Sequence, residues 1–199
     1  MEKRGPEQKQ DRRTRYTKGV IKESFMKLLQ QKPFAKITVT EICRLSDINR
    51  GTFYLHYYDV YDVLDDLIYD LFHHTSGIID HVLCPQRSAC AYPLCEKIQG
   101  SSQYHALIMD DVASARFLEK LSDFAKEGFV TFLMQNSRLT FEEAEAVFCF
   151  QINGCLTINK LMIKNHCTDW HKVQNVIDEY IRAGLKTHIN AQNCQPLRR

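Results

Sequence analysis

The chain has 199 residues, 44% hydrophobic and 25% charged, which is ordinary for a globular protein with one or two packed domains. No run approaches the ~20 apolar residues of a membrane-spanning helix, and no apolar signal segment follows the polar N-terminus, so we expect a cytoplasmic protein. Residues 1–58 hold 13 Lys or Arg and 6 Asp or Glu, whereas residues 59–199 hold 13 and 18, an asymmetry that favours a polyanionic partner for the N-terminal part.

The first expected element is a helix over residues 13–31, after a disordered tail over residues 1–12 that is rich in charges and contains Gly and Pro. Its apolar stripe is Ile21, Phe25 and Leu28. Thr38 and Glu41 have the T-x-x-E spacing of a capping box, which predicts a second helix that starts after Thr38 and ends near Ser46.

A turn at residues 47–49 then leads to a third helix over residues 50–57, capped by Asn49. Asp59, with Asp62 as its box partner, is expected to cap a long helix over residues 60–83. Further helices are expected at residues 93–99, 103–109, 114–135, 140–164 and 169–186, the fourth of these opened by a second capping box at Thr140 and Glu143. The pattern predicts an all-α fold of about nine helices, with a helix-turn-helix domain at residues 13–58, a larger bundle at residues 59–190 and a tail at residues 191–199.

The helix over residues 50–57 has the features of a helix that reads the DNA major groove. Phe53 and Tyr57 are four residues apart and face inward, while Gly51 lets the backbone approach DNA. Arg50 suits a guanine edge or a phosphate, and a phosphate also suits the N–H groups at the start of the preceding helix. The complete set of expected DNA contacts is Lys36, Thr38, Thr40, Arg50, Gly51, Thr52, Tyr54, His56 and Tyr57.

The segment TVTEICRLSDINRGTFYLHY resembles the helix-turn-helix of the TetR/AcrR family of bacterial transcription regulators. The matching residues are Thr38, Glu41, Ile42, Ile48, Arg50, Gly51, Thr52, Phe53, Tyr54, His56 and Tyr57, and the similarity covers residues 13–72. The resemblance implies a homodimer, a double-stranded DNA operator and a C-terminal domain that senses a small-molecule effector. Val60 departs from it, because the family usually has a phosphate-binding Lys there. Lys36 or Arg15 could take over that contact.

The resemblance also implies that the last two long helices pair with their copies in a second chain. The expected interface residues are Phe148, Ile152, Cys155, Asn159, Val173, Ile177, Tyr180 and Ile181; the alternative is that these faces form intramolecular core. An effector pocket would lie between the helices that start near residues 60, 114 and 140. Its candidate lining is Phe72, Tyr104, Phe117, Phe124 and Phe150, although aromatics at helical spacing are also typical of plain core.

We therefore expect a ligand-responsive repressor that binds a palindromic operator. The alternatives are a protein-binding adaptor that keeps the fold, and a metal- or thiol-responsive regulator that uses the histidines and cysteines His73, His74, His81, Cys84, Cys90 and Cys95. Their spacing matches no standard metal site, and the eight cysteines include no CxxC pair, so no resident metal or cofactor is expected. Cys43 is expected to be a small core residue. No nucleotide-binding or catalytic motif occurs, which argues against an enzyme.

Overall fold

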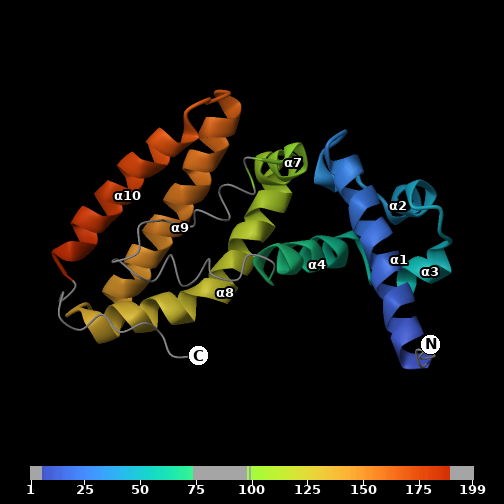
Figure 1. Ribbon diagram of the computed structural model, residues 1–199, viewed down its shortest axis with the longest axis horizontal. Coiled ribbons are helices and arrows are strands. Elements are labelled where there is room, and N and C mark those ends of the chain that lie inside the picture. Colours follow the sequence, from blue (N-terminus) through green and yellow to red (C-terminus); the bar gives the residue numbers. More distant parts are fainter. Residues whose placement is uncertain (1–5, 74–97, 99, 189–199) are drawn as a thin grey trace, which may run out of the picture.

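The computed structural model describes residues 6–73, 98 and 100–188, and these residues form an all-α protein without a β-strand (Figure 1). The N-terminal helices α1, α2 and α3 lie at one end of the molecule, α9 and α10 lie at the other, and α4, α7 and α8 connect them. The elements are α1 (Pro6–Leu29), the short 3-10 turn η1 (Phe34–Lys36), α2 (Val39–Leu45), α3 (Arg50–Tyr54), α4 (Val60–His73), α7 (Ser102–Met109), α8 (Asp111–Asn136), α9 (Phe141–Lys164) and α10 (Trp170–Lys186).

Local hydrogen bonds fix the start of α2 and of α3. The Glu41 N–H donates to Thr38 Oγ1 at 3.3 Å, and the Thr38 N–H donates to Glu41 Oε2 at 3.1 Å, which confirms the predicted capping box. Asn49 Oδ1 accepts the Thr52 N–H at 2.7 Å, as expected for the cap of α3. Between the two helices Asp47 adopts a positive φ of 53°, so the chain reverses within a tight turn.

Two boundaries differ from the prediction. α1 begins at Pro6, so the expected disordered tail over residues 1–12 is too long. Proline is well suited to the first position of a helix, and the Glu, Gln and Lys residues after it have high helix propensity. α3 is regular only as far as Tyr54; a turn in which the Tyr57 N–H donates to the Phe53 carbonyl at 3.0 Å completes it. The expected helical segments at residues 74–83 and 93–97 and the tail at residues 191–199 lie outside the described residues.

One hydrophobic cluster joins the N-terminal helices to the rest of the chain. It includes Ile21, Phe25, Ile42, Phe53 and Leu64 from α1 to α4, and Leu107, Ile108 and Phe117 from α7 and α8. A second cluster, around Phe129, Leu133 and Phe148, joins α8 to α9. The helix-turn-helix therefore does not pack as a separate body, because its core continues through α4 into α7 and α8.

Asp110 ties the end of the N-terminal unit to the start of α8. Its Oδ2 accepts the Phe34 N–H at 2.8 Å, while its Oδ1 caps α8 by accepting the Ala113 N–H at 2.9 Å. One carboxylate thus satisfies backbone donors from both parts of the molecule. The position of η1 relative to α8 is fixed by this bridge.

Candidate nucleic-acid interface

The outer face of α3 presents hydrogen-bond donors to solvent. Arg50 is exposed and Tyr54 is 49% exposed. The Arg50 guanidinium donates from Nη2 to Tyr54 Oη at 3.2 Å and lies 5.8 Å from the centre of the Tyr54 ring, so the two side chains hold each other in place. Gly51 is exposed between them, and a Cβ there would lie only 3.2 Å from the Asn49 oxygen that caps the helix. A larger residue at Gly51 would therefore crowd the cap.

The opposite face of α3 is locked into the core. Phe53 is fully buried, and its ring centre lies 5.5 Å from that of Tyr54 and 5.9 Å from that of Tyr57. Tyr57 is only 3% exposed and its hydroxyl donates to Asp66 Oδ2 at 2.6 Å. Burial, reinforced by the Asp66 carboxylate, raises the pKa of Tyr57 well above its ordinary value. Tyr57 therefore supports α3 from inside, and its inclusion among the DNA contacts was wrong.

The start of α2 presents the second set of expected DNA contacts. Lys36, Thr38 and Thr40 are all exposed. The capping box uses the N–H groups of Thr38 and Glu41, which leaves those of Val39 and Thr40 for an outside acceptor. Hydrogen bonds from Lys32 and Thr38 lower the pKa of Glu41 to about 2. The box is therefore held by an ionised carboxylate at neutral pH.

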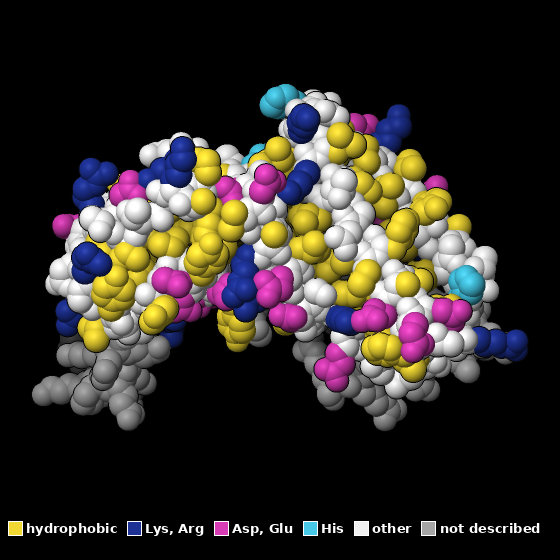
Figure 2. Space-filling view, turned by 180° about the vertical axis from the view of Figure 1, so that it is seen from behind, with side chains coloured by type: hydrophobic (Ala, Val, Ile, Leu, Met, Phe, Trp, Pro, Cys, Tyr) yellow, Lys and Arg dark blue, Asp and Glu magenta, His cyan; other side chains and the backbone are white. Residues whose placement is uncertain are grey.

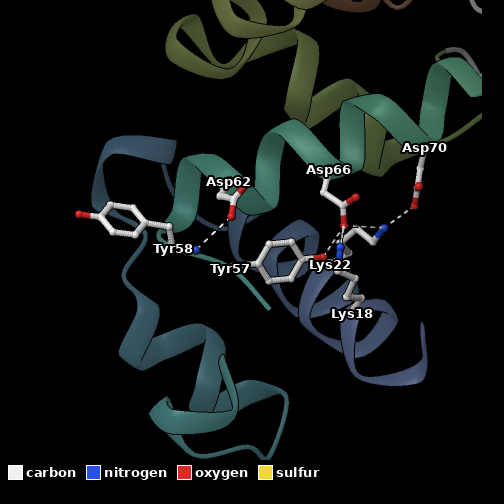
Figure 3. Close-up of polar contacts among 7 residues, drawn as sticks. All are labelled: Lys18, Lys22, Tyr57, Tyr58, Asp62, Asp66 and Asp70. Atoms are coloured by element: carbon white, nitrogen blue, oxygen red, sulfur yellow. Dashed lines mark hydrogen bonds and ion pairs between the residues drawn. The ribbon is translucent and has the colours of Figure 1, made fainter. Parts of the chain in front are cut away.

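A cluster of charged residues joins α1 to α4 beside Tyr57 (Figure 3). Lys18 and Lys22 of α1 place their ammonium groups 3.3 and 3.2 Å from Asp66 Oδ2, and Lys22 also pairs with Asp70. Burial raises the pKa of Asp66, but the Tyr57 hydroxyl and the two lysines outweigh it, so that the pKa is lowered. Asp66 thus links α1, α4 and Tyr57, which follows α3.

A second carboxylate on α4 faces the opposite way, toward α8. Arg116 binds Asp65 with two hydrogen bonds of 2.7 Å, from Nε and from Nη2, and the Lys120 ammonium lies 3.1 Å from the same carboxylate. Neighbouring residues on one helix thus bind two different partners, α1 through Asp66 and α8 through Asp65. These ion pairs were not anticipated, although Lys18 and Lys22, like Asp66 and Asp70, have the spacing of four that puts charges on one helix face.

Three of the five aromatics expected to line an effector pocket lie together. Phe72 is 4% exposed, and its ring centre lies 5.5 Å from that of Phe117 and 5.3 Å from that of Phe124. Phe72 and Phe124 line an open groove of about 580 Å³ between α1, α4 and α8. Tyr104 is half-buried and packs against the hydrophobic cluster that joins the N-terminal helices to α7 and α8. Phe150 is 71% exposed on α9, so the expectation that it lines a cavity within the chain was wrong.

The residues expected at a dimer interface divide into three groups. Phe148 and Asn159 are buried within the chain at 3% and 5% exposure, so they belong to the intramolecular packing and the interface expectation for them is corrected. Tyr180 is 69% exposed. The half-buried remainder comprises Ile152, Cys155, Val173, Ile177 and Ile181. Cys155, Val173 and Ile177 line a small cavity of about 30 Å³ between α9 and α10.

The candidate metal or thiol sensor cannot be placed, since the His73 side chain and the residues His74, His81, Cys84, Cys90 and Cys95 lie outside the described part. Among the described residues no three His, Cys, Asp or Glu side chains are grouped as metal ligands. Cys43 is 5% exposed, as expected of a core residue. Burial raises the pKa of its thiol despite the nearby Arg50, so Cys43 lacks the thiolate character of a reactive cysteine.

Comparison with known proteins identifies the fold. No protein-family model and no curated protein matches the sequence. Among solved structures, the fatty acid degradation regulator FadR from Bacillus halodurans superimposes with a TM-score of 0.58 over 98% of this chain and 100% of its own, at 11% identity. The dihydroxyacetone kinase operon activator DhaS (16% identity) and the TetR family repressor AlkX from Dietzia sp. strain DQ12-45-1b (13% identity) each give a TM-score of 0.51 over 87% of this chain and 98% of theirs.

Proposed function

We propose that this chain, which has the fold of TetR-like transcription regulators, binds duplex DNA through α3 and controls transcription as a ligand-responsive repressor. The observation that carries the proposal is the division of α3 into two faces. Arg50 and Tyr54 stand exposed as a coupled donor pair, while Phe53 is fully buried beneath them. A rigidly seated helix with exposed donors, in the basic part of the chain, suits major-groove binding.

The proposed repressor acts as a two-fold dimer built on α9 and α10. By length and composition α9 could cross a membrane, yet few residues of its most apolar stretch are buried within the chain. A single such helix is weak evidence for a membrane, and an unfilled apolar face also suits a partner helix. Figure 2 shows hydrophobic side chains spread over the end of the molecule formed by α9 and α10. The most exposed hydrophobic side chains of α9 and α10 are Phe150 at 71%, Tyr180 at 69% and Val176 at 60%.

The signal in this proposal passes through α4. An effector near Phe72 and Phe124 would change the packing of α4 against α8, and Asp66 would carry the movement to α1 and Tyr57. The effector must bind the DNA-incompetent arrangement more tightly, since only differential affinity shifts the equilibrium. The cluster of phenylalanine rings favours an effector with an apolar body. Among the similar structures, DhaS is described as an activator and AlkX as a repressor.

Replacing Tyr54 by alanine tests the assignment of α3. The probe is the duplex that the intact protein enriches from a randomised pool, and binding is followed by fluorescence anisotropy. Tyr54→Ala removes the partner of Arg50 and should weaken binding at least ~30-fold, or ~2 kcal/mol. Met134→Ala, at a 44% exposed side chain on α8, is the control and should bind like the wild type. Equal affinities for the two variants would show that α3 is not the helix that binds the major groove.

A further inference from the structure

A small cavity lies between α9 and α10, at the end of the molecule opposite to α1, α2 and α3 (Figure 1). Its volume is about 30 Å³, which is room for about two water-sized groups. Residues 155–162 of α9 and residues 170–178 of α10 supply its lining. The lining residues of each helix follow one another mostly at intervals of three or four, so they share one helix face. We call this space the α9–α10 cavity.

The face of α10 that lines the cavity is polar at positions where a packed helix is usually apolar. Trp170, Gln174 and Asp178 follow one another at intervals of four along this face. Trp170 and Asp178 are each only 4% exposed. Polar groups that are buried in this way need hydrogen-bond partners, because they have lost those that water would provide.

Two of the buried polar groups of α10, a donor and an acceptor, have no partner among the residues that the structure describes. The indole N–H of Trp170 and the Oε1 atom of Gln174 are both buried, and neither makes a hydrogen bond. On the α9 side, by contrast, Asn159 Nδ2 donates to the Cys155 carbonyl at 2.7 Å. The unpaired donor and the unpaired acceptor therefore lie one helical turn apart on α10, beside the same cavity.

These two groups specify the chemistry of a ligand that would bind both. It must accept a hydrogen bond from Trp170 and donate one to Gln174, which a hydroxyl group does with a single oxygen atom. An ammonium group cannot accept from Trp170, and a carboxylate cannot donate to Gln174. The Asp178 carboxylate in the lining also repels an anion. A carbon chain on the ligand would contact the apolar part of the lining, which comprises Ile158, Met162, Val173 and Ile177.

We infer that the α9–α10 cavity binds the hydroxyl group of a small neutral alcohol, which accepts a hydrogen bond from the Trp170 indole N–H and donates one to Gln174 Oε1. The volume limits the enclosed part of the alcohol to the hydroxyl and the carbon that carries it. This site is separate from the groove near Phe72 and Phe124. The inference goes beyond the proposed function, because it requires neither DNA nor an effector in that groove.

The Trp170 indole itself reports binding. Trp170 is the only tryptophan of the chain, so its indole N–H gives a single signal in a ¹H–¹⁵N correlation spectrum. The intact protein is titrated with three compounds of similar size: ethanol, which donates and accepts hydrogen bonds, acetonitrile, which only accepts, and ethylammonium, which only donates. Ethanol should move the indole proton signal downfield along a curve that saturates.

The other two compounds test the two hydrogen bonds separately. Acetonitrile should bind roughly 5-fold more weakly than ethanol, since it lacks the hydrogen bond to Gln174, and ethylammonium should leave the indole signal in place. Equal affinities for ethanol and acetonitrile would overturn the inference. A shift that rises in proportion to the ethanol concentration without saturating would overturn it too.

Replacing Gln174 by methionine tests the acceptor. Met has a similar length but lacks the amide oxygen, so Gln174→Met should bind ethanol roughly 5-fold more weakly and acetonitrile as the wild type does. Gln135→Met, at an exposed glutamine on α8, is the matched control and should change neither affinity. A folded Gln174→Met protein with wild-type affinity for ethanol would contradict the assignment. The comparison of the three compounds uses only the wild type, so it tests the inference even where the variant does not fold.

A bound water can make the same two hydrogen bonds as an alcohol hydroxyl. The spectrum of the protein in plain buffer distinguishes the two sources. An indole proton that is already shifted downfield, shows a nuclear Overhauser effect to a long-lived water and does not respond to ethanol would overturn the alcohol assignment. None of these measurements involves DNA, so failure of this inference is distinguishable from failure of the proposed function.

Discussion

At the scale of single residues, side chains that lie close together within residues 50–57 face different surroundings. Arg50 and Tyr54 are four apart and share the outer face, where they contact each other. Phe53 and Tyr57 are also four apart and share the inner face. Tyr54 and Tyr57 are chemically identical, yet one faces solvent and the other donates to a carboxylate on α4.

Removing one hydroxyl tests the inward role of Tyr57. Tyr57→Phe deletes the donor to Asp66 but keeps the ring, so the free energy of unfolding should fall by about 1–2 kcal/mol. DNA affinity of the folded protein should stay near that of the wild type. Chemical denaturation and anisotropy measure the two quantities. Tyr58→Phe, at a tyrosine that is 85% exposed, is the control and should change neither. Weaker DNA binding at unchanged stability would instead indicate that Tyr57 contacts DNA.

At the scale of elements, the starts of α2 and α9 illustrate what a sequence can predict well. Each start depends on a box of four residues, Thr38 to Glu41 and Thr140 to Glu143, whose hydrogen bonds close within the segment itself. The position of an element that is held by distant parts of the chain is harder to predict from its sequence. α4 owes its position to Asp65 and Asp66, whose partners lie about fifty residues away along the chain.

The lowered pKa of Glu41 in the α2 capping box predicts how the free energy of unfolding depends on pH. The pKa of Glu41 is lowered from 4.5 to about 2, so its ionised form stabilises the fold, fully above about pH 4.5 and progressively less as the pH falls toward 2. Glu41→Gln should therefore be less stable than the wild type at pH 6, and the difference in free energy of unfolding should shrink between pH 4.5 and pH 2. Urea denaturation across this range measures it.

A second variant separates the ion pair from the rest of the box. Lys32→Met removes the cation that pairs with Glu41 while leaving Thr38 in place. Its stability difference from the wild type should follow the same pH dependence as that of Glu41→Gln. A difference that is constant from pH 6 to pH 2 in both variants would show that the Glu41 charge does not stabilise α2.

The differences between the sequence-based predictions and the structure have two physical origins. Periodicity identified the apolar faces of α8 and α9, but it could not tell which neighbour each face meets. Phe148 and Phe150 illustrate this, because one is buried against Phe129 and the other is 71% exposed. The helix-turn-helix was predicted almost completely because its turn, cap and aromatic pairs are all local. The early start of α1 was missed because a charged segment was taken as disordered although its residues favour helix.

At the scale of the whole molecule, α4 is the element that connects the N-terminal helices to the bundle. Its buried face belongs to the core shared with α1, α7 and α8, and its carboxylates pair with α1 on one side and α8 on the other. A change in the packing of α4 against α8 would therefore move α1 and Tyr57 together. The apolar side chains left exposed on α9 and α10 lie at the far end from α3, so in the proposed dimer a second copy would bind without covering α3.

The most direct test of the central claim is to incubate the intact protein with duplexes of randomised sequence and to sequence those it retains. The proposed function predicts that an inverted repeat is enriched, with half-sites ~34 Å apart or a multiple of that distance. Sedimentation velocity of the complex should then give an even number of chains on each duplex. No enriched sequence, or a single chain bound to a site without two-fold symmetry, would contradict the account.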